Sequence, residues 1–237
     1  MAACLLANTF IYFTESLNML TLVRSNRDHL TNYVIRQLAQ FFPDGTEEHL
    51  LMSQISRDLD EALGRLQVCI NAVRMWRENE FDFLHSSQYT IFLYFLANTI
   101  WRNGGDKVLC TKLFYLNKTL NGIDLFYEVE MPSVFFIGHS VGIVLAKATY
   151  SDYLVLYQNS TVGKNHGVAP VLEEGVVMYP NTAVIGRCHV ATGSVIGQGV
   201  SVVNQDTPGH CLVFQGHGGE LVFRNNERPI LADIFRL

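Results

Sequence analysis

The stretch that decides the fold is Phe136-Ile-Gly-His-Ser-Val-Gly-Ile-Val-Leu-Ala-Lys-Ala148, where a six-residue repeat begins. Aliphatic or aromatic residues then recur every six positions, with one interruption, at Val144, Tyr150, Leu156, Val162, Leu172, Met178, Val184, Val190, Ile196 and Val202. A small or aliphatic residue follows most of them by four positions, as Ala148 follows Val144. A period of six matches neither a helix, at about 3.6 residues per turn, nor the two-residue alternation of a strand. It is typical of a parallel β-helix, whose short rungs bury a core only by stacking.

The repeat predicts an α+β chain in which helices precede a left-handed parallel β-helix at about 133–206. Six side chains are expected inside the coil: Val144, Leu156, Met178, Val184, Val190 and Ile196. The interruption lies at 163–170, where ten residues instead of six separate Val162 from Leu172, so a loop projects there. The predicted domains are a helical domain at 1–125, the β-helix at 126–210 and a tail at 211–237 that flanks the last rung.

Ahead of the repeat, apolar residues recur at helical spacing. They predict helices at 30–42, 47–77, 88–101 and 107–120. The third is almost entirely apolar but too short to span a bilayer, so a buried helix is expected. The apolar stretch at 1–13 lacks a positively charged start, and we interpret it as a further buried helix and not as a signal or a membrane span.

Composition narrows the class of protein. The 237 residues carry a net charge of −5 and no basic run, which argues against nucleic acid as a partner. The five cysteines, Cys4, Cys69, Cys110, Cys188 and Cys211, are scattered and form no CxxC motif. They are interpreted as reduced thiols of a cytoplasmic protein, and no metal site is expected.

Four segments carry a resemblance to a known family. They are His139-Ser-Val-Gly-Ile-Val-Leu-Ala-Lys-Ala, Val155-Leu-Tyr-Gln-Asn-Ser-Thr-Val-Gly163, and Glu174-Gly-Val-Val-Met-Tyr with Ala183-Val-Ile-Gly186. Together with the apolar helix before the coil, they make residues 85–216 similar to serine acetyltransferase. The resemblance is closer still to the serine-acetyltransferase-like proteins of bacterial surface-polysaccharide loci.

The resemblance implies an acetyl-CoA-dependent O-acetyltransferase that acts on the hydroxyl of serine or a related small acceptor, with both substrates bound together. The family's general base is the histidine at the position of His139. Imidazole suits that role because its unperturbed pKa of about 6.5 lies near neutral pH. In the family a carboxylate upstream orients the ring. Glu128 is preferred for that role here, and Glu130 is the alternative.

The resemblance also implies where the ligands bind. The coenzyme is expected along the outside of the coil, between neighbouring subunits, at Gly163, Pro180, Gln198, Gly199 and Gly216. His166 in the projecting loop and Asp82 before the apolar helix are the expected acceptor-binding residues. Because a slender coil offers no deep pocket of its own, a homotrimer or a dimer of trimers is expected.

The chain departs from the family pattern at three places. Gly138 stands where the family has an aspartate that helps hold the amino-acid acceptor, and Ala169 replaces a histidine that grips it. Tyr179, Pro180 and Gln198 replace small residues along the coenzyme surface. Two alternatives therefore stay open. One is acetylation of a sugar or nucleotide sugar in surface-polysaccharide biosynthesis, and the other is a non-catalytic protein that binds another enzyme through its helices.

Overall fold

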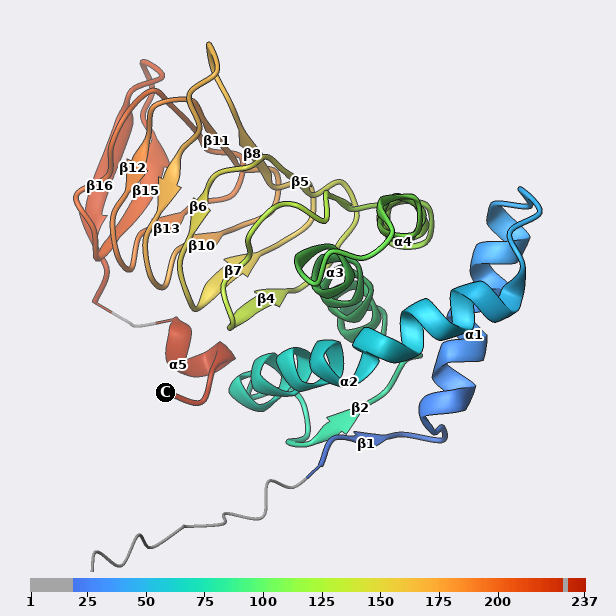
Figure 1. Ribbon diagram of the computed structural model, residues 1–237. Helices are drawn as coiled ribbons and strands as arrows, with labels where there is room; N and C mark the ends of the chain where they lie inside the picture. Colours follow the sequence, from blue (N-terminus) through green and yellow to red (C-terminus); the bar gives the residue numbers. More distant parts are fainter. Residues whose placement is uncertain (1–18, 228–229) are drawn as a thin grey trace, which may run out of the picture.

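The computed structural model describes residues 19–227 and 230–237, so the helix predicted at 1–13 lies outside the described residues. Helices form the N-terminal half, and a three-sided coil of short strands stacks beside them (Figure 1). The predicted fold class is confirmed, because helices are followed by a parallel β-helix.

Four helices build the N-terminal half: α1 (Arg27–Phe41), α2 (Glu48–Ala72), α3 (Ser86–Arg102) and α4 (Lys107–Asn121). They match the predicted helices closely, except that α2 ends at Ala72 and not at 77. Two short parallel strands, β1 (Thr21–Leu22) and β2 (Glu80–Phe81), pair beside them. Helix α4 is followed by Gly122, whose φ of 66° lets the chain turn into the coil.

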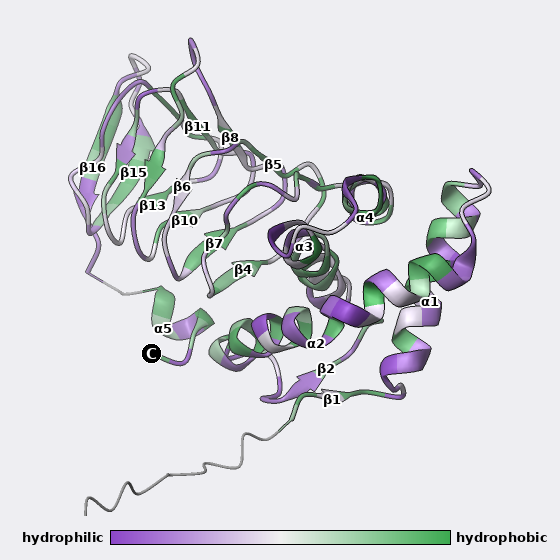
Figure 2. Ribbon diagram, in the orientation of Figure 1, coloured by the Kyte–Doolittle hydropathy of each residue, from purple (hydrophilic) through white to green (hydrophobic). Residues whose placement is uncertain are grey.

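Helix α3 lies at the centre of the molecule, as its apolar sequence predicted. Fourteen of its 17 residues are buried. Its polar side chains bond the chain that enters the coil, because Asn98 donates to the Tyr127 carbonyl at 2.7 Å and the Tyr94 hydroxyl donates to the Val129 carbonyl at 2.6 Å. Figure 2 shows hydrophobic residues on α3 and on the neighbouring strands β4 (Phe135–Ile137) and β7 (Leu154–Leu156). Among the described residues, no helix has the length and apolarity needed to cross a bilayer.

The coil has three sheets, one on each side. The first contains β3 (Asp124–Leu125), β5 (Val144–Leu145), β8 (Thr161–Gly163), β11 (Ala183–Ile185) and β14 (Ser201–Val203). The second contains β6 (Thr149–Tyr150), β9 (Val171–Leu172) and β12 (His189–Val190). The third contains β4, β7, β10 (Val177–Met178), β13 (Val195–Ile196), β15 (Cys211–Gln215) and β16 (Leu221–Asn225). All pairs in the coil are parallel except β15 with β16, which closes its end.

Five of the six predicted interior side chains are fully buried, namely Leu156, Met178, Val184, Val190 and Ile196. The prediction for Val144 is wrong, because Val144 is 43% exposed while its neighbour Leu145 is 4% exposed and pairs with Val162. The cause is an irregular first rung. Eight residues separate the interior residues Ile137 and Leu145, and five separate Leu145 from Tyr150, so the inward register shifts by one.

The C-terminal residues return to the helices. After β16 the chain forms the short α5 (Leu231–Ile234), and the next residue, Phe235, forms a β-bridge with Val73 at the end of α2. The Arg236 guanidinium donates to the Val73 carbonyl at 2.6 Å and to the Trp76 carbonyl at 2.6 Å. The C-terminal segment therefore supplies β15 as the last parallel strand of the coil and also joins that end of the coil to the N-terminal half.

Candidate active site

His139 lies on an enlarged turn after β4. On the regular rungs, the Asn181 amide donates to the Gln158 carbonyl at 3.0 Å and the Gly199 amide donates to the Pro180 carbonyl at 3.1 Å. On the first rung, the Asn159 amide donates to the Val141 carbonyl at 2.9 Å. Val141 therefore occupies the corner position that Gln158 and Pro180 occupy on the later rungs. His139 and Ser140 are two extra residues on this side of the first rung, which spans eight residues instead of six.

The enlarged turn is anchored on both sides of His139. The Ser140 hydroxyl donates to the Asn121 carbonyl at 2.6 Å, and the Ser87 hydroxyl, in the first turn of α3, donates to the Gly138 carbonyl at 3.2 Å. The imidazole of His139 is exposed and makes no hydrogen bond or ion pair with any described residue. The anchored backbone therefore presents an imidazole that is free to accept a proton from a bound ligand.

The two predicted orienting carboxylates, Glu128 and Glu130, do not lie beside His139. Glu128 forms an ion pair with Lys147, and Glu130 is exposed. Both line a hollow of about 370 Å³ together with Ala169 and Pro170, and His139 is not among its lining residues. Within one chain, the structure does not bring either glutamate to His139.

Asp124 is a carboxylate that the sequence reasoning missed. Its amide donates to the Ile143 carbonyl at 2.8 Å, at the end of the enlarged turn, and its carboxylate pairs with Lys118 at 2.6 Å. Asp124 therefore lies on the strand next to the His139 turn. Counting hexads does not place it there, because the first rung is longer than six residues.

The predicted coenzyme residues lie mostly on one corner of the coil. Pro180, Gln198 and Gly199 occupy turns of successive rungs at the same corner as His139, and Gly216 follows β15 at the next rung. Gly163 ends β8 on the adjoining side of the coil. The structure thus brings His139 and four of these five residues to one edge.

The two predicted acceptor-binding residues flank this region separately. His166 is at the tip of a tight hairpin, closed by hydrogen bonds of 2.9 and 3.0 Å between Asn165 and Val168, and its ring is exposed. Asp82 pairs with Arg24 at 2.7 Å and accepts a hydrogen bond from the Leu84 amide at 3.0 Å, just before α3. Asp82 is held close to the helix end whose Ser87 contacts Gly138.

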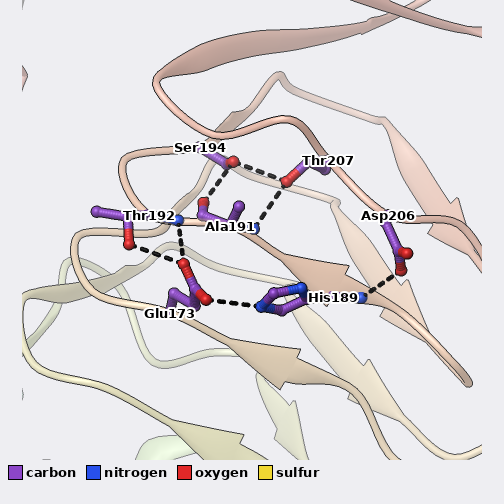
Figure 3. A network of polar contacts seen from close by, with 7 residues as sticks. All are labelled: Glu173, His189, Ala191, Thr192, Ser194, Asp206 and Thr207. Carbon is purple, nitrogen blue, oxygen red and sulfur yellow. Dashed lines mark hydrogen bonds and ion pairs between the residues drawn. The ribbon is translucent and has the colours of Figure 1, made fainter.

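A second histidine on the coil has a different environment. His189 on β12 bonds Glu173 through Nε2 at 2.7 Å, and Glu173 also accepts from the Thr192 hydroxyl at 2.8 Å and amide at 2.9 Å (Figure 3). The Thr192 hydroxyl, followed by its amide and by His189, holds the pKa of Glu173 below its ordinary value. Every member of this network already has a partner, so it stabilises the neighbouring rungs.

Thiols offer no nucleophile here. The cysteines of the described chain are free and buried. Burial raises the pKa of Cys69 to about 12 and that of Cys110 to about 11, which suppresses the reactive thiolate. Within the same residues, no group of three or more His, Cys, Asp and Glu side chains is placed to hold a metal ion.

Comparisons with known proteins give one relative and many solved neighbours. No protein-family model matches the sequence. The plasmid serine acetyltransferase of Synechococcus elongatus is 31% identical over 93 residues, which cover 33% of this chain and 29% of that protein. The match therefore spans less than a third of that relative's length.

Two solved structures show the likeness over most of the chain. The serine acetyltransferase of Vibrio cholerae O1 biovar El Tor superposes with a TM-score of 0.68 at 18% identity, covering 88% of this chain and 84% of that one. A serine acetyltransferase in complex with CoA gives 0.64 at 18% identity, covering 82% and 83%. The chain therefore has the fold of these solved proteins, with N-terminal helices followed by a parallel β-helix. Among these, it resembles the serine acetyltransferases.

Proposed function

We propose that this chain is an acetyl-CoA-dependent O-acetyltransferase that acts on the hydroxyl of serine or a related small acceptor. The observation that carries the proposal is His139, an exposed imidazole without a protein partner on a doubly anchored turn at the first rung of the coil. The resemblance to serine acetyltransferases supports the reaction class, and one of the solved neighbours is a complex with CoA.

In the proposed reaction, acceptor and acetyl-CoA bind together and the acetyl group passes directly between them. His139 removes the proton of the acceptor hydroxyl while the hydroxyl oxygen bonds to the thioester carbonyl carbon. The carbon–sulfur bond then breaks, and the proton on His139 passes to the sulfur. The products are the O-acetylated acceptor and free CoA, and the chain forms no covalent bond at any step.

A carboxylate near His139 would hold its ring in the tautomer that accepts a proton. Glu128 and Glu130 are the candidates from the sequence, and Asp124 is the candidate from the structure. The hydrogen bond between the Asp124 amide and the Ile143 carbonyl supports Asp124 for this role. Asp124 and Glu128 each pair with a lysine, so the ion pairs do not rank them. Glu128 and Glu130 are the weaker candidates within one chain because they line a hollow that His139 does not line.

The coenzyme is proposed to lie along the corner formed by Pro180, Gln198, Gly199 and Gly216, near Gly163. This corner is a convex edge of one coil, so a second copy of the chain is proposed to cover it. A trimer, or two trimers joined through their helices, would supply such copies. Acetyl-CoA is available in the cytoplasm, and we propose that the protein works there.

Purified protein incubated with acetyl-CoA and hydroxyl acceptors tests the proposal. CoA release measured with a thiol reagent, and a mass increase of the acceptor by one acetyl group, are the expected results. His139→Ala should abolish most of the release while acetyl-CoA binding, measured by calorimetry, persists. Equal turnover in wild type and His139→Ala would contradict His139 as the base. No turnover in wild type with any acceptor would make a non-catalytic binding role the better account.

The second candidate function is acetylation of a sugar. It is favoured by Gly138, which stands where the resembling family has an acceptor-binding aspartate.

A further inference from the structure

The two anchors of the His139 turn lead back to the same end of helix α3. The first anchor is direct, because the Ser87 hydroxyl donates to the Gly138 carbonyl at 3.2 Å. The second anchor runs through α4. It starts at the Thr90 carbonyl, next to Ser87 in the first turns of α3, which accepts a hydrogen bond from the side-chain amide of Asn117 at 3.0 Å.

The second anchor continues from Asn117 to the residue that follows His139. The Oδ1 atom of Asn117 accepts a hydrogen bond from the side-chain amide of Asn121 at 2.8 Å. The Asn121 carbonyl in turn accepts a hydrogen bond from the Ser140 hydroxyl at 2.6 Å. These bonds therefore form a closed ring that runs from α3 through α4 to the His139 turn and back to α3.

Asn117 is a polar residue in an apolar position. It is 2% exposed and lies among the buried residues of α4, which include Leu113 and Leu116. A buried amide loses its solvation, and it is retained where hydrogen bonds replace the lost water. Leucine would fill the same volume without that cost. What the amide provides, and leucine would not, is the connection between α3 and the end of α4 that holds Ser140.

We propose that Asn117 is a positioning residue for His139, because it ties the end of α4 to α3 and so fixes the turn that presents the imidazole. This inference rests on the proposed acetyltransferase function and adds to it a residue that acts through the turn. The His139 ring has no partner among the described residues, so its position depends on the backbone on either side. A general base must lie within hydrogen-bond reach of the proton that it removes, and a displacement of about 1 Å can cost about 10²-fold in rate.

Hydrogen exchange of the Asn117→Leu variant tests the connection without any assay of activity. The variant should fold, because the Thr90 carbonyl keeps its bond inside the helix and the half-buried Asn121 amide can turn to water. Exchange of the amides at 138–144, followed by mass spectrometry, should become about fivefold faster, the equivalent of one lost hydrogen bond. Exchange at 177–185, on later rungs, should not change. Unchanged exchange at 138–144 overturns the connection.

Steady-state kinetics test the positioning role. Asn117→Leu should lower kcat by about 10- to 100-fold. The KM for acetyl-CoA should stay unchanged, because the coenzyme is proposed to bind along later rungs. Faster exchange at the turn with an unchanged kcat overturns the positioning role. Absence of turnover in wild type overturns the acetyltransferase proposal and the positioning role together, whereas the exchange experiment still decides whether Asn117 holds the turn.

Asn98→Leu is the matched control for a loss of stability. Asn98 is also a fully buried asparagine on a helix of the N-terminal half, and its amide donates to the Tyr127 carbonyl, outside the ring of bonds. The control should lower the thermal midpoint at least as much as Asn117→Leu, because it leaves the buried Tyr127 carbonyl without its donor. It should leave both kcat and the exchange at 138–144 unchanged. An equal loss of kcat in Asn98→Leu means that general destabilisation explains both variants, and it overturns the positioning role.

A double-mutant cycle tests whether Asn117 and Ser140 belong to one anchor. Ser140→Ala removes the hydroxyl at the far end of the anchor and should lower kcat by an amount similar to Asn117→Leu. The double variant should lose about as much as the more damaging single variant, because both changes break the same connection. Losses in kcat that multiply would show that the two residues act separately and would overturn the inference.

Discussion

The first rung of the coil and the regular rungs that follow it place a histidine in opposite environments. On β12 the repeat keeps its period of six, and His189 faces Glu173 across neighbouring strands at 2.7 Å. On the first rung, two extra residues place His139 outside the β-ladder. Its ring has no hydrogen-bond or ion-pair partner among the described residues. Regular stacking pairs polar groups with their neighbours on adjacent rungs. A side chain becomes free for chemistry where the stacking is interrupted.

The largest expected effect comes from a charge inside a regular rung. Val190→Asp should prevent soluble expression, because Val190 is fully buried and an unpaired buried carboxylate costs several kcal/mol. Val144→Asp is the matched control on the first rung, where the side chain is 43% exposed, and it should express normally. Soluble yield and circular dichroism measure both, and loss of folding in Val144→Asp would mean that the first rung keeps the regular register after all.

The next largest effect is expected on turnover, where substitutions of His139 and His189 should differ. His139→Ala should lower turnover by about 10²–10⁴-fold, the usual contribution of a positioned general base. His189→Ala should leave turnover unchanged, since its ring is bonded to Glu173 on another side of the coil. Steady-state kinetics with the accepted substrate decide this, and a comparable loss in His189→Ala would erase the distinction between the two rungs.

The shifted register of the first rung predicts that substitutions at Leu145 and Val144 change the free energy of unfolding by different amounts. Leu145→Ala should cost about 2–5 kcal/mol of unfolding free energy, because it leaves a cavity in the core of the coil. Val144→Ala shortens a side chain that is 43% exposed and leaves no interior cavity, so it should cost less than about 0.5 kcal/mol. Chemical denaturation measures both values. The reverse order would restore the sequence-based prediction for Val144.

Three carboxylates can be ranked by their effect on turnover. Asp124→Asn should lower it by about tenfold or more, as expected for a group that orients the base, although less than loss of His139 itself. Glu128→Gln and Glu130→Gln should have smaller effects within one chain. If Glu128→Gln or Glu130→Gln is the damaging change, a neighbouring copy of the chain must bring that carboxylate to His139, and the pH dependence of kcat/KM should shift in that variant alone.

The smallest effect concerns the network on the regular rungs. Because the pKa of Glu173 is lowered from its ordinary value in the folded chain, its ionised form stabilises the fold above that ordinary value. This stabilisation is lost as the pH falls through the folded pKa. Glu173→Gln should therefore lower the thermal midpoint slightly at about pH 7, and the difference from wild type should shrink as the pH falls below the ordinary pKa of a glutamate and through the lowered one. A difference that grows on acidification would contradict this assignment.

The repeating architecture and the identity of the candidate base follow from the order of the amino acids alone. Val, Ile and Leu side chains that recur every six residues can all be buried only in a three-sided coil. The apolar run at 88–101 can be shielded from water only at the centre of the molecule. These features depend on local spacing, so they can be recognised along the chain. His139 was identifiable because the resemblance rests on the residues that follow it.

The surroundings of His139, by contrast, depend on how the rungs stack in three dimensions. The two extra residues of the first rung, followed by a spacing of only five residues from Leu145 to Tyr150, leave Val144 pointing outward. Asp124 pairs beside the end of the turn, whereas Glu128 and Glu130 line a hollow that His139 does not line. Tyr157 fills the space at Gly138, and the Gln158 oxygen is left buried without a partner among the described residues. Such contacts join residues about twenty positions apart across stacked rungs, and their register depends on the length of every intervening turn. A hexad count cannot supply that length where the period breaks.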